Sequence, residues 1–390
     1  MLRPGISGVL RTILGLVLGL SCALASERTR AFPQDDTAAA IDRIFAPLAN
    51  GKSPGVAVLV RNAGRNIFER GYGAQELRTF AKIDAQTNFR LASCSKQFTA
   101  AAIMLLVHDR KLRYADKLTD VFPEFPAYGK AITIRHLLNH TSGLPDYEDL
   151  MAVEEKRKGA AIWSETRQIQ DAEVLQLLEK ETAGKFAPGT RWSYSNSGYV
   201  VLGLVVAKIS GQPFAQFLRE RTFVPLRMTQ TLAYEKGKSE VSRRAYGHSK
   251  EGDAWKETDQ SPTSATLGDG GIYSSLADLA KWDEALAQHT LLSKAEMQPA
   301  LTPVKLANGS QPKWPADSDR PEGTPVAYGF GWFLDPYRGH QRTWHYGDTM
   351  GFHSYIARFA ADKLSVIVLC NRTDLDPEAL ALKVADLVLQ

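Results

Sequence analysis

The sequence predicts an α/β fold of the α+β type, with one sheet built from both ends of the chain and a helical region inserted between them. Three observations favour this fold class. Strand patterns occur near the start of the chain, at 55–72, and near its end, at 354–369. Helical patterns dominate the stretch of roughly 112–290 between them. Residues 93–122 contain neither Gly nor Pro, and the start of this stretch, 95–111, favours a long buried helix.

The first part of the chain predicts a helix, a strand hairpin and the long helix. Asp36 can cap a helix over 36–48, where apolar residues recur at helical spacing. The apolar run at 55–60 predicts a buried strand, and 66–72 can return beside it as a hairpin partner. Residues 95–111 are rich in Ala, Leu, Ile, Met and Phe, so we expect a long buried helix.

The middle of the chain is mostly helical by pattern, most clearly at 174–181 and 198–209. The polar and charged stretch at 235–262 predicts a surface excursion. Six of the 19 prolines fall between 299 and 325, which indicates a long irregular loop. We expect both segments to shape the rim of a cleft.

The end of the chain predicts a second hairpin and a closing helix. Strand patterns at 354–359 and 364–369 flank the turn at 360–363. Residues 377–390 have the pattern of a final helix. No internal repeat is visible in the sequence.

The composition indicates a globular protein and excludes several classes. The chain has 390 residues with 44% hydrophobic content, which excludes a disordered chain. Its formal charge is +4, and it falls to +2 without residues 1–25, which hold two arginines and no acid. A nucleic-acid binder usually carries a larger basic excess, so we expect no nucleic-acid partner. Three cysteines exclude a disulfide scaffold.

The first 25 residues predict an export signal. Arg3 and Arg11 precede a short apolar run at 12–20, and a small-x-small end follows, with cleavage after Ala25. We therefore expect a periplasmic or secreted protein with a loose segment at 26–35 and no stable membrane span once the signal is removed.

Two alternatives for the N-terminus are a lipoprotein anchored at Cys22 and an uncleaved membrane anchor. Gly19 stands where a lipobox has Leu, which argues against anchoring at Cys22. Cys94 and Cys370 remain after cleavage, either as two free buried thiols or as one disulfide.

A Ser-x-x-Lys motif, Ser93 to Lys96, opens the expected long helix. With 24 serines and 21 lysines the chain should contain about one such spacing by chance, and a second does occur at Ser310 and Lys313. The second lies in the Pro-rich loop, where no helix can hold the two side chains together. At the start of a helix, by contrast, residues three apart share a face, so Lys96 can reach the Ser93 hydroxyl.

A serine at a helix start has the surroundings that an acylating nucleophile needs. The adjacent amine can take its proton, and the unpaired backbone N–H groups favour negative charge. Tyr194 and Asn196 form the single Tyr-x-Asn in the chain, just before a helix, where the tyrosine oxygen can face a cleft. His345 and Gly347 lie near the C-terminal strands, where a glycine allows a substrate to approach a strand edge.

These three motifs, in this order, resemble those of the serine β-lactamase and penicillin-binding superfamily in its class C-like branch. That branch includes class C β-lactamases, D-alanyl-D-alanine carboxypeptidases, D-aminopeptidases and esterases. Other segments are also similar to the family, at 89–92, 137–144, 270–279 and 328–332.

The resemblance implies a β-lactamase/transpeptidase-like fold, an antiparallel sheet flanked by helices plus an inserted helical region. One catalytic domain would span 36–390. Its α/β lobe would come from about 36–111 and 290–390, and its helical lobe from about 112–289.

The resemblance also implies a role for each motif residue. Ser93 would be the nucleophile, and Lys96 and Tyr194 would share the proton transfers, with the choice of base left open. The backbone N–H groups of Ser93 and Asp348, which follows Gly347, would form the oxyanion hole.

Two further roles follow from the same motifs. Asn196 would bind the substrate amide or orient Lys96. His345 stands where β-lactamases carry Lys, and would place the substrate as a pH-dependent cation or relay a proton.

The implied activity is that of a secreted serine hydrolase that acts through an acyl-enzyme on esters or on D-amino-acid-containing peptides or amides. It would need no metal and no organic cofactor. The alternatives are a class C-type β-lactamase and a non-catalytic penicillin- or muropeptide-binding protein. His136 and His140 have metal-compatible spacing, but the sequence shows no clear third ligand, which argues against a metal site.

Overall fold

The computed structural model describes residues 34–316, 318 and 320–389 of the chain. The predicted export signal at 1–25, Cys22 and most of the expected loose segment at 26–35 lie outside the described residues. Helix α1 (Gln34–Phe45) is described from Gln34 onward, so Asp36 lies inside this helix and does not cap it. Residues 34 and 35 are therefore helical, not loose.

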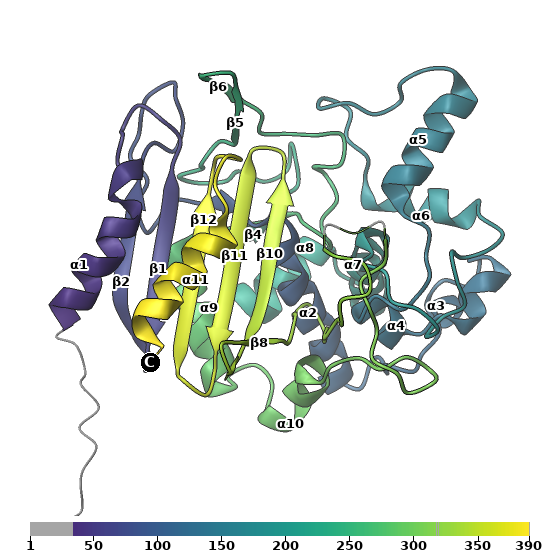
Figure 1. Ribbon diagram of the computed structural model, residues 1–390. Helices are drawn as coiled ribbons and strands as arrows, with labels where there is room; N and C mark the ends of the chain where they lie inside the picture. The colour runs from purple at the N-terminus through teal and green to yellow at the C-terminus, as the bar shows by residue number, and fades with distance from the viewer. Residues whose placement is uncertain (1–33, 317, 319, 390) are drawn as a thin grey trace, which may run out of the picture.

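A five-stranded antiparallel sheet forms from the two ends of the chain, as the sequence predicts (Figure 1). The strand order is β10-β11-β12-β1-β2, and Val58 lies opposite Val368 where the N-terminal hairpin joins the C-terminal strands. The strands are β1 (Val56–Asn62), β2 (Arg65–Tyr72), β10 (Thr343–Thr349), β11 (Phe352–Phe359) and β12 (Leu364–Cys370).

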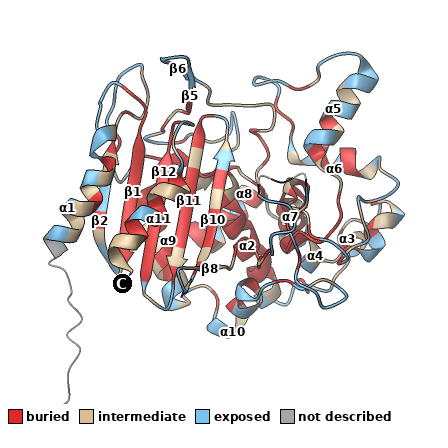
Figure 2. Ribbon diagram, in the orientation of Figure 1, coloured by how far each residue is buried: buried red, intermediate tan, exposed pale blue. Residues whose placement is uncertain are grey.

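Both faces of this sheet are buried, which explains why β1 and β12 are nearly continuous apolar runs (Figure 2). Val56, Val58 and Val60 point into one apolar core, whereas Ala57 and Leu59 point into the other. Helix α1 covers the first face with α11, and α2 and α9 lie against the second (Figure 1). These helices are α11 (Pro377–Val388), α2 (Lys96–His108) and α9 (Leu276–Gln288).

The stretch between the two strand regions is mainly helical, and the helices predicted at 174–181 and 198–209 are confirmed as α6 and α7. Helix α7 packs on α2, so the two apolar helices form the centre of the molecule (Figure 2). Besides α2 and α9, the helices between the two strand regions are α3 (Leu118–Val121), α4 (Ile134–Leu138), α5 (Tyr147–Lys158), α6 (Asp171–Glu179), α7 (Asn196–Ser210), α8 (Phe214–Leu218) and α10 (Lys294–Met297).

Short strands complete the fold, and one pair of them falls within the predicted surface excursion at 235–262. That segment contains the hairpin of β5 and β6, whose tip is exposed. The predicted loop at 299–325 is irregular apart from a short turn at its start. The short strands are β3 (Phe89–Arg90), β4 (Leu232–Ala233), β5 (His248–Glu251), β6 (Ala254–Glu257), β7 (Ile272–Ser274), β8 (Pro336–Tyr337) and β9 (His340–Gln341).

The two cysteines within the described ranges, Cys94 and Cys370, are free and buried, so they do not form a disulfide. In the part of the chain that the structure describes, no single helix is long and apolar enough to cross a membrane. Among the described residues, one bent helix pair, Asn196–Ser210 with Phe214–Phe223 at an angle of 78°, meets those criteria of length and composition. Helix α7, the first of this pair, is largely buried.

Candidate active site

Ser93 lies in a short 3-10 turn, η2 (Ala92–Ser95), that leads directly into α2. Its side chain is half-buried, whereas its neighbours Ala92 and Cys94 are buried. Ala92 has a φ of +47°, a left-handed conformation that residues other than glycine rarely adopt. Strained backbone of this kind is typical of functional sites, and here it sets the direction of the turn that carries Ser93.

Lys96 connects the first two sequence motifs through its side-chain amine. Its Nζ donates to the Ser93 Oγ at 3.0 Å, to the Asn196 Oδ1 at 2.8 Å and to the Asp269 carbonyl oxygen at 2.9 Å. Lys96 is fully buried, and this burial lowers its pKa from 10.5 to about 8. The amine is therefore within reach of the nucleophile and can lose its proton near neutral pH.

Tyr194 stands next to this amine, with its ring centroid 4.8 Å from the Lys96 Nζ. Burial raises the Tyr194 pKa well above its ordinary value of 10, and the nearby Ser93 hydroxyl only partly offsets this effect. The Tyr194 hydroxyl makes no hydrogen bond of normal geometry within the described residues. It is therefore a neutral group that can donate a proton to a substrate.

His345 on β10 is fully buried, which argues against the expected role as a pH-dependent cation. Its Nδ1 lies 2.6 Å from the Tyr346 carbonyl oxygen and its Nε2 lies 3.2 Å from the Tyr328 hydroxyl. Burial, together with the nearby Lys96, lowers the His345 pKa to about 3. The ring is neutral, and its two nitrogens are engaged by the protein.

The backbone around His345 joins β10 to the turn of the nucleophile. The Cys94 thiol donates to the His345 carbonyl oxygen at 3.3 Å. At Gly347, an added Cβ would lie 2.1 Å from the Leu91 carbonyl oxygen. The side chain of Asp348 points to solvent and pairs with His353 at 3.1 Å. The strand and the turn are thus in direct contact, and the oxyanion hole made by the Ser93 and Asp348 N–H groups stays a prediction.

Replacing Gly347 by alanine tests this contact. The new methyl group would overlap a backbone oxygen, so we expect a loss of about 1–3 kcal/mol of unfolding free energy. Turnover should fall by more than this loss of stability alone explains. Gly51→Ala is the matched control, because a Cβ there meets nothing within 4 Å. Thermal unfolding and ester hydrolysis measure both effects, and equal behaviour of the two variants would refute the close packing.

A cavity of about 490 Å³ opens beside Tyr194, and it was not predicted from the sequence. Trp314 and Pro315 of the Pro-rich loop contribute to it, in line with the expected role of that loop at a cleft rim. The segment at 235–262 does not contribute to its lining. The lining residues are Asp146, Asp149, Lys185, Trp192, Ser193, Tyr194, Trp314, Pro315, Ser318 and Tyr346.

Asp146 and Asp149 line this cavity, and Glu148 stands between them in the sequence. Desolvation raises the pKa of Asp146, and desolvation with the neighbouring Asp146 raises that of Glu148 to about 7. Glu148 also interacts electrostatically with Lys96. In the sequence, the acidic residues around Tyr147, directly after the 137–144 segment, are the signal that could have indicated this acidic lining.

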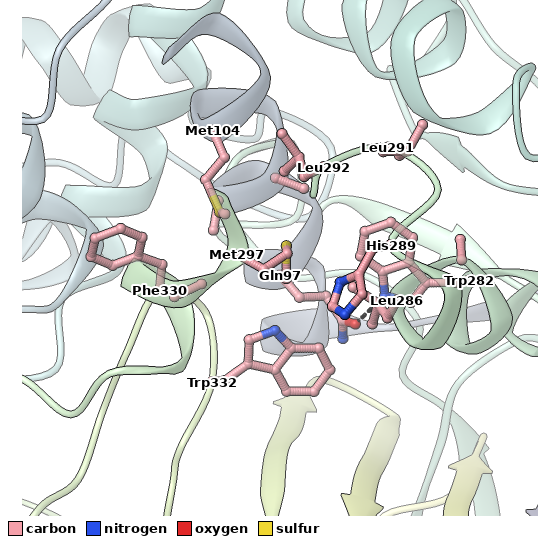
Figure 3. A pocket seen from close by; sticks show the side chains of 14 residues that line it. Gln97, Met104, Trp282, Leu286, His289, Leu291, Leu292, Met297, Phe330 and Trp332 are labelled. Carbon is pink, nitrogen blue, oxygen red and sulfur yellow. Dashed lines mark hydrogen bonds between the residues drawn. The ribbon is translucent and has the colours of Figure 1, made fainter. Parts of the chain in front are cut away.

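A second pocket, lined mainly by apolar side chains, lies against α2 (Figure 3). Its free space is about 20 Å³, room for about one water molecule, so it cannot hold a substrate. Gln97 forms part of its wall, accepts from the Trp282 Nε1 at 2.5 Å and donates to the Cys94 carbonyl oxygen at 2.9 Å. These two hydrogen bonds connect α9 to the turn that carries Ser93.

The histidines considered as metal ligands have other partners. His136 accepts from the Thr133 N–H at 3.2 Å at the start of α4, and His140 lies among buried aromatic rings. Within the described ranges, no group of three or more His, Cys, Asp or Glu side chains is placed to hold a metal ion.

The fold and this site define the class of active-site-serine proteins that contains β-lactamases and penicillin-binding proteins. The chain belongs to the Beta-lactamase family, whose model matches residues 41–390. It is similar to penicillin-binding protein 4* of Bacillus subtilis, with 32% identity over 366 residues that cover 90% of this chain and 75% of that protein.

Solved structures of low identity share the fold. The octameric penicillin-binding protein homologue of Pyrococcus abyssi has a TM-score of 0.73 at 24% identity, covering 92% of this chain and 78% of that one. The D-amino acid amidase of Ochrobactrum anthropi SV3, complexed with L-phenylalanine amide, has a TM-score of 0.71 at 24% identity, covering 90% and 96%.

Proposed function

We propose that this protein is an exported serine hydrolase that forms an acyl-enzyme on Ser93 and cleaves D-amino-acid amides or peptides, or esters. One observation carries the proposal: the Lys96 Nζ donates to the Ser93 Oγ at 3.0 Å from a fully buried position. A base that close to a half-buried serine is the arrangement that activates a hydroxyl nucleophile.

The chemistry proceeds in two halves. The Ser93 Oγ attacks the substrate carbonyl carbon while the neutral Lys96 amine takes the hydroxyl proton, and the oxyanion is held by the Ser93 and Asp348 N–H groups. The intermediate then expels the amine or alcohol, which receives a proton from Tyr194. Water next attacks the ester on Ser93 and gives a proton to the Tyr194 oxygen, and Lys96 returns its proton to the Ser93 Oγ as the acid leaves, which restores the free enzyme.

Lys96 is the better candidate for the base in the free enzyme. The Lys96 pKa is lowered to about 8, whereas the pKa of Tyr194 is raised well above 10. At neutral pH a fraction of the lysine is already deprotonated, while the tyrosine keeps its proton for the leaving group. Asn196 holds the amine in position through its Oδ1.

The pH dependence of acylation follows from this assignment. The lysine must be neutral to accept a proton, so we expect kcat/KM to rise about tenfold per pH unit below pH 8 and to level off above it. A neutral p-nitrophenyl ester should be used, so that the substrate itself does not titrate. A profile that is flat from pH 6 to 9 would refute Lys96 as the base.

The acidic side of the cavity supports a substrate that carries an ammonium group near the scissile bond. Asp146 and Asp149 line this cavity and would attract such a cation, and Trp192 and Tyr346 offer aromatic surface beside them. A D-amino-acid amide carries such an ammonium group, and an aromatic one such as D-phenylalanine amide can also contact the aromatic surface. Lys185 also lines the cavity and opposes this preference, so the acids must outweigh it.

Replacing Asp149, which lines the cavity, by asparagine tests the ammonium preference. A lost hydrogen bond to a charged group costs about 1.5–3 kcal/mol, so KM for D-phenylalanine amide should rise about tenfold or more. KM for the N-acetylated amide, which carries no charge, should not change and serves as the control. Equal effects on both substrates would show that Asp149 does not bind the ammonium group.

One purified sample assayed against p-nitrophenyl esters, D-amino-acid amides and nitrocefin ranks the possible activities. We expect ester and D-amide cleavage to exceed nitrocefin turnover, because the buried His345 supplies no cation for the carboxylate of a β-lactam. Strong nitrocefin turnover without ester or amide cleavage would favour a class C-type β-lactamase. No turnover and no covalent adduct with a fluorophosphonate or penicillin would favour a binding protein.

A further inference from the structure

His140 holds the backbone on both sides of Tyr194. The Ser193 N–H donates to the His140 carbonyl oxygen at 3.0 Å, and the Ser195 N–H donates to the His140 Nδ1 at 3.1 Å. One residue, more than 50 positions earlier in the chain, thus fixes the two peptide groups that flank the tyrosine.

His140 is itself rigidly held. It is fully buried at the end of α4, and its φ of +61° is a left-handed conformation that costs free energy for a histidine. Its ring lies against those of Tyr194 and Tyr328, with centroids 4.4 Å and 4.6 Å away. A strained, buried residue with this packing cannot move without displacing the tyrosine.

The hydrogen bond to Ser195 also defines the state of the ring. Because the Nδ1 accepts a hydrogen bond from the Ser195 N–H, the neutral ring carries its own hydrogen on Nε2. The Nε2 is buried and has no partner among the described residues. Burial, with the nearby Lys96 and His345, lowers the His140 pKa well below its ordinary value of 6.5, which keeps the Nδ1 free to accept.

We propose that His140 is a positioning residue that acts through Tyr194, keeping its hydroxyl where it can protonate the leaving group. It would act through its ring contact with Tyr194 and through the backbone beside that residue. This inference rests on the proposed function, because it assumes the acyl-enzyme on Ser93 and the proton transfer from Tyr194.

Two substitutions separate this role from a general effect on folding. In His140→Asn the amide oxygen lies near the former Nδ1 position, and asparagine tolerates a positive φ, so the bond to the Ser195 N–H is kept. In His140→Ala the acceptor is lost. If His140→Ala does not fold, His140→Gln is used in its place. The glutamine amide oxygen reaches past the Nδ1 position, so this variant also lacks the acceptor for the Ser195 N–H.

The readout is the dependence on the leaving group. An alkyl ester or amide needs a proton at its leaving atom, whereas p-nitrophenolate leaves without one. We expect His140→Ala to lower kcat for the amide or alkyl ester by about 10- to 100-fold and to change kcat for the p-nitrophenyl ester by less than about threefold. His140→Asn should restore most of the loss, with KM unchanged in both variants.

Equal losses on both kinds of substrate, or an asparagine variant no better than the alanine variant, would overturn the positioning role. Labelling of Ser93 by a fluorophosphonate is measured in the same samples. If the wild type is labelled but the leaving-group effect is missing, the inference on His140 fails while the proposed function stands. If the wild type is not labelled, the proposed function itself fails.

Discussion

Ser93→Ala is expected to abolish turnover of every substrate that the wild-type protein cleaves. The variant should keep the fold, because the Ser93 side chain is half-buried and the hydrogen bond that its hydroxyl accepts from Lys96 comes from a helix that is buried without it. Without the oxygen that forms the acyl bond, kcat should fall roughly 10³- to 10⁶-fold, to the background of the assay.

The chain offers its own control for this experiment. Ser310 and Lys313 have the same spacing, but Ser310 lies exposed in the loop at 299–325 and its hydroxyl donates to the Asn308 Oδ1 at 2.7 Å. Ser310→Ala should therefore retain full activity. Steady-state kinetics and covalent labelling of both variants decide between the motifs, and an active Ser93→Ala would exclude this serine as nucleophile.

Lys96→Met should have the second largest effect on activity. Removing the general base is expected to lower kcat/KM by roughly 10²- to 10⁴-fold, because the Ser93 hydroxyl would lose the group that takes its proton. Lys313→Met in the second Ser-x-x-Lys is the matched control and should leave kcat/KM unchanged. A Lys96→Met enzyme that keeps most of its activity would assign the base to another group.

The stability of Lys96→Met should move in the opposite direction to its activity. The pKa of Lys96 falls from 10.5 to about 8 in the folded protein, so below pH 8 the buried charge costs about 3 kcal/mol of unfolding free energy. The variant removes this cost but leaves the Asn196 Oδ1 and the Asp269 carbonyl without their donor. We therefore expect an unfolding free energy at pH 7 that is equal to or higher than that of the wild type.

This difference should shrink as the pH rises. Between pH 8 and 10.5 the unfolded chain binds more protons at Lys96 than the folded protein does, so the stability of the wild type rises relative to the variant. Chemical denaturation at pH 7 and pH 10 measures the change. A Lys96→Met variant that is much less stable at both pH values would show that the lysine is mainly structural.

Much of the fold could be predicted because the sheet strands and central helices have unmistakable patterns. The apolar runs of β1 and β12 require burial on both faces, and the alternation of Val58 and Leu59 between two cores shows that burial. The hairpin at 248–257 was missed, since its residues are mostly polar and exposed and carry no periodic apolar signal.

The candidate site was predictable where local spacing determines the contact. Ser93 and Lys96 lie three residues apart at a helix start, so their contact follows from helical geometry. The burial of His345 depends on Tyr328 and the sheet, which lie far away in the sequence, so spacing could not reveal it. The same holds for the Asp269 carbonyl, since a backbone oxygen has no sequence signature.

The central claim is that catalysis proceeds through an acyl-enzyme on Ser93, and locating the covalent label tests it most directly. The protein is treated with a fluorophosphonate until ester hydrolysis stops, and the adduct is then mapped by digestion and mass spectrometry. We predict one adduct per chain, on Ser93, forming in step with the loss of activity. Complete inactivation with the adduct on another residue, or continued turnover by a protein fully labelled at Ser93, would contradict the claim.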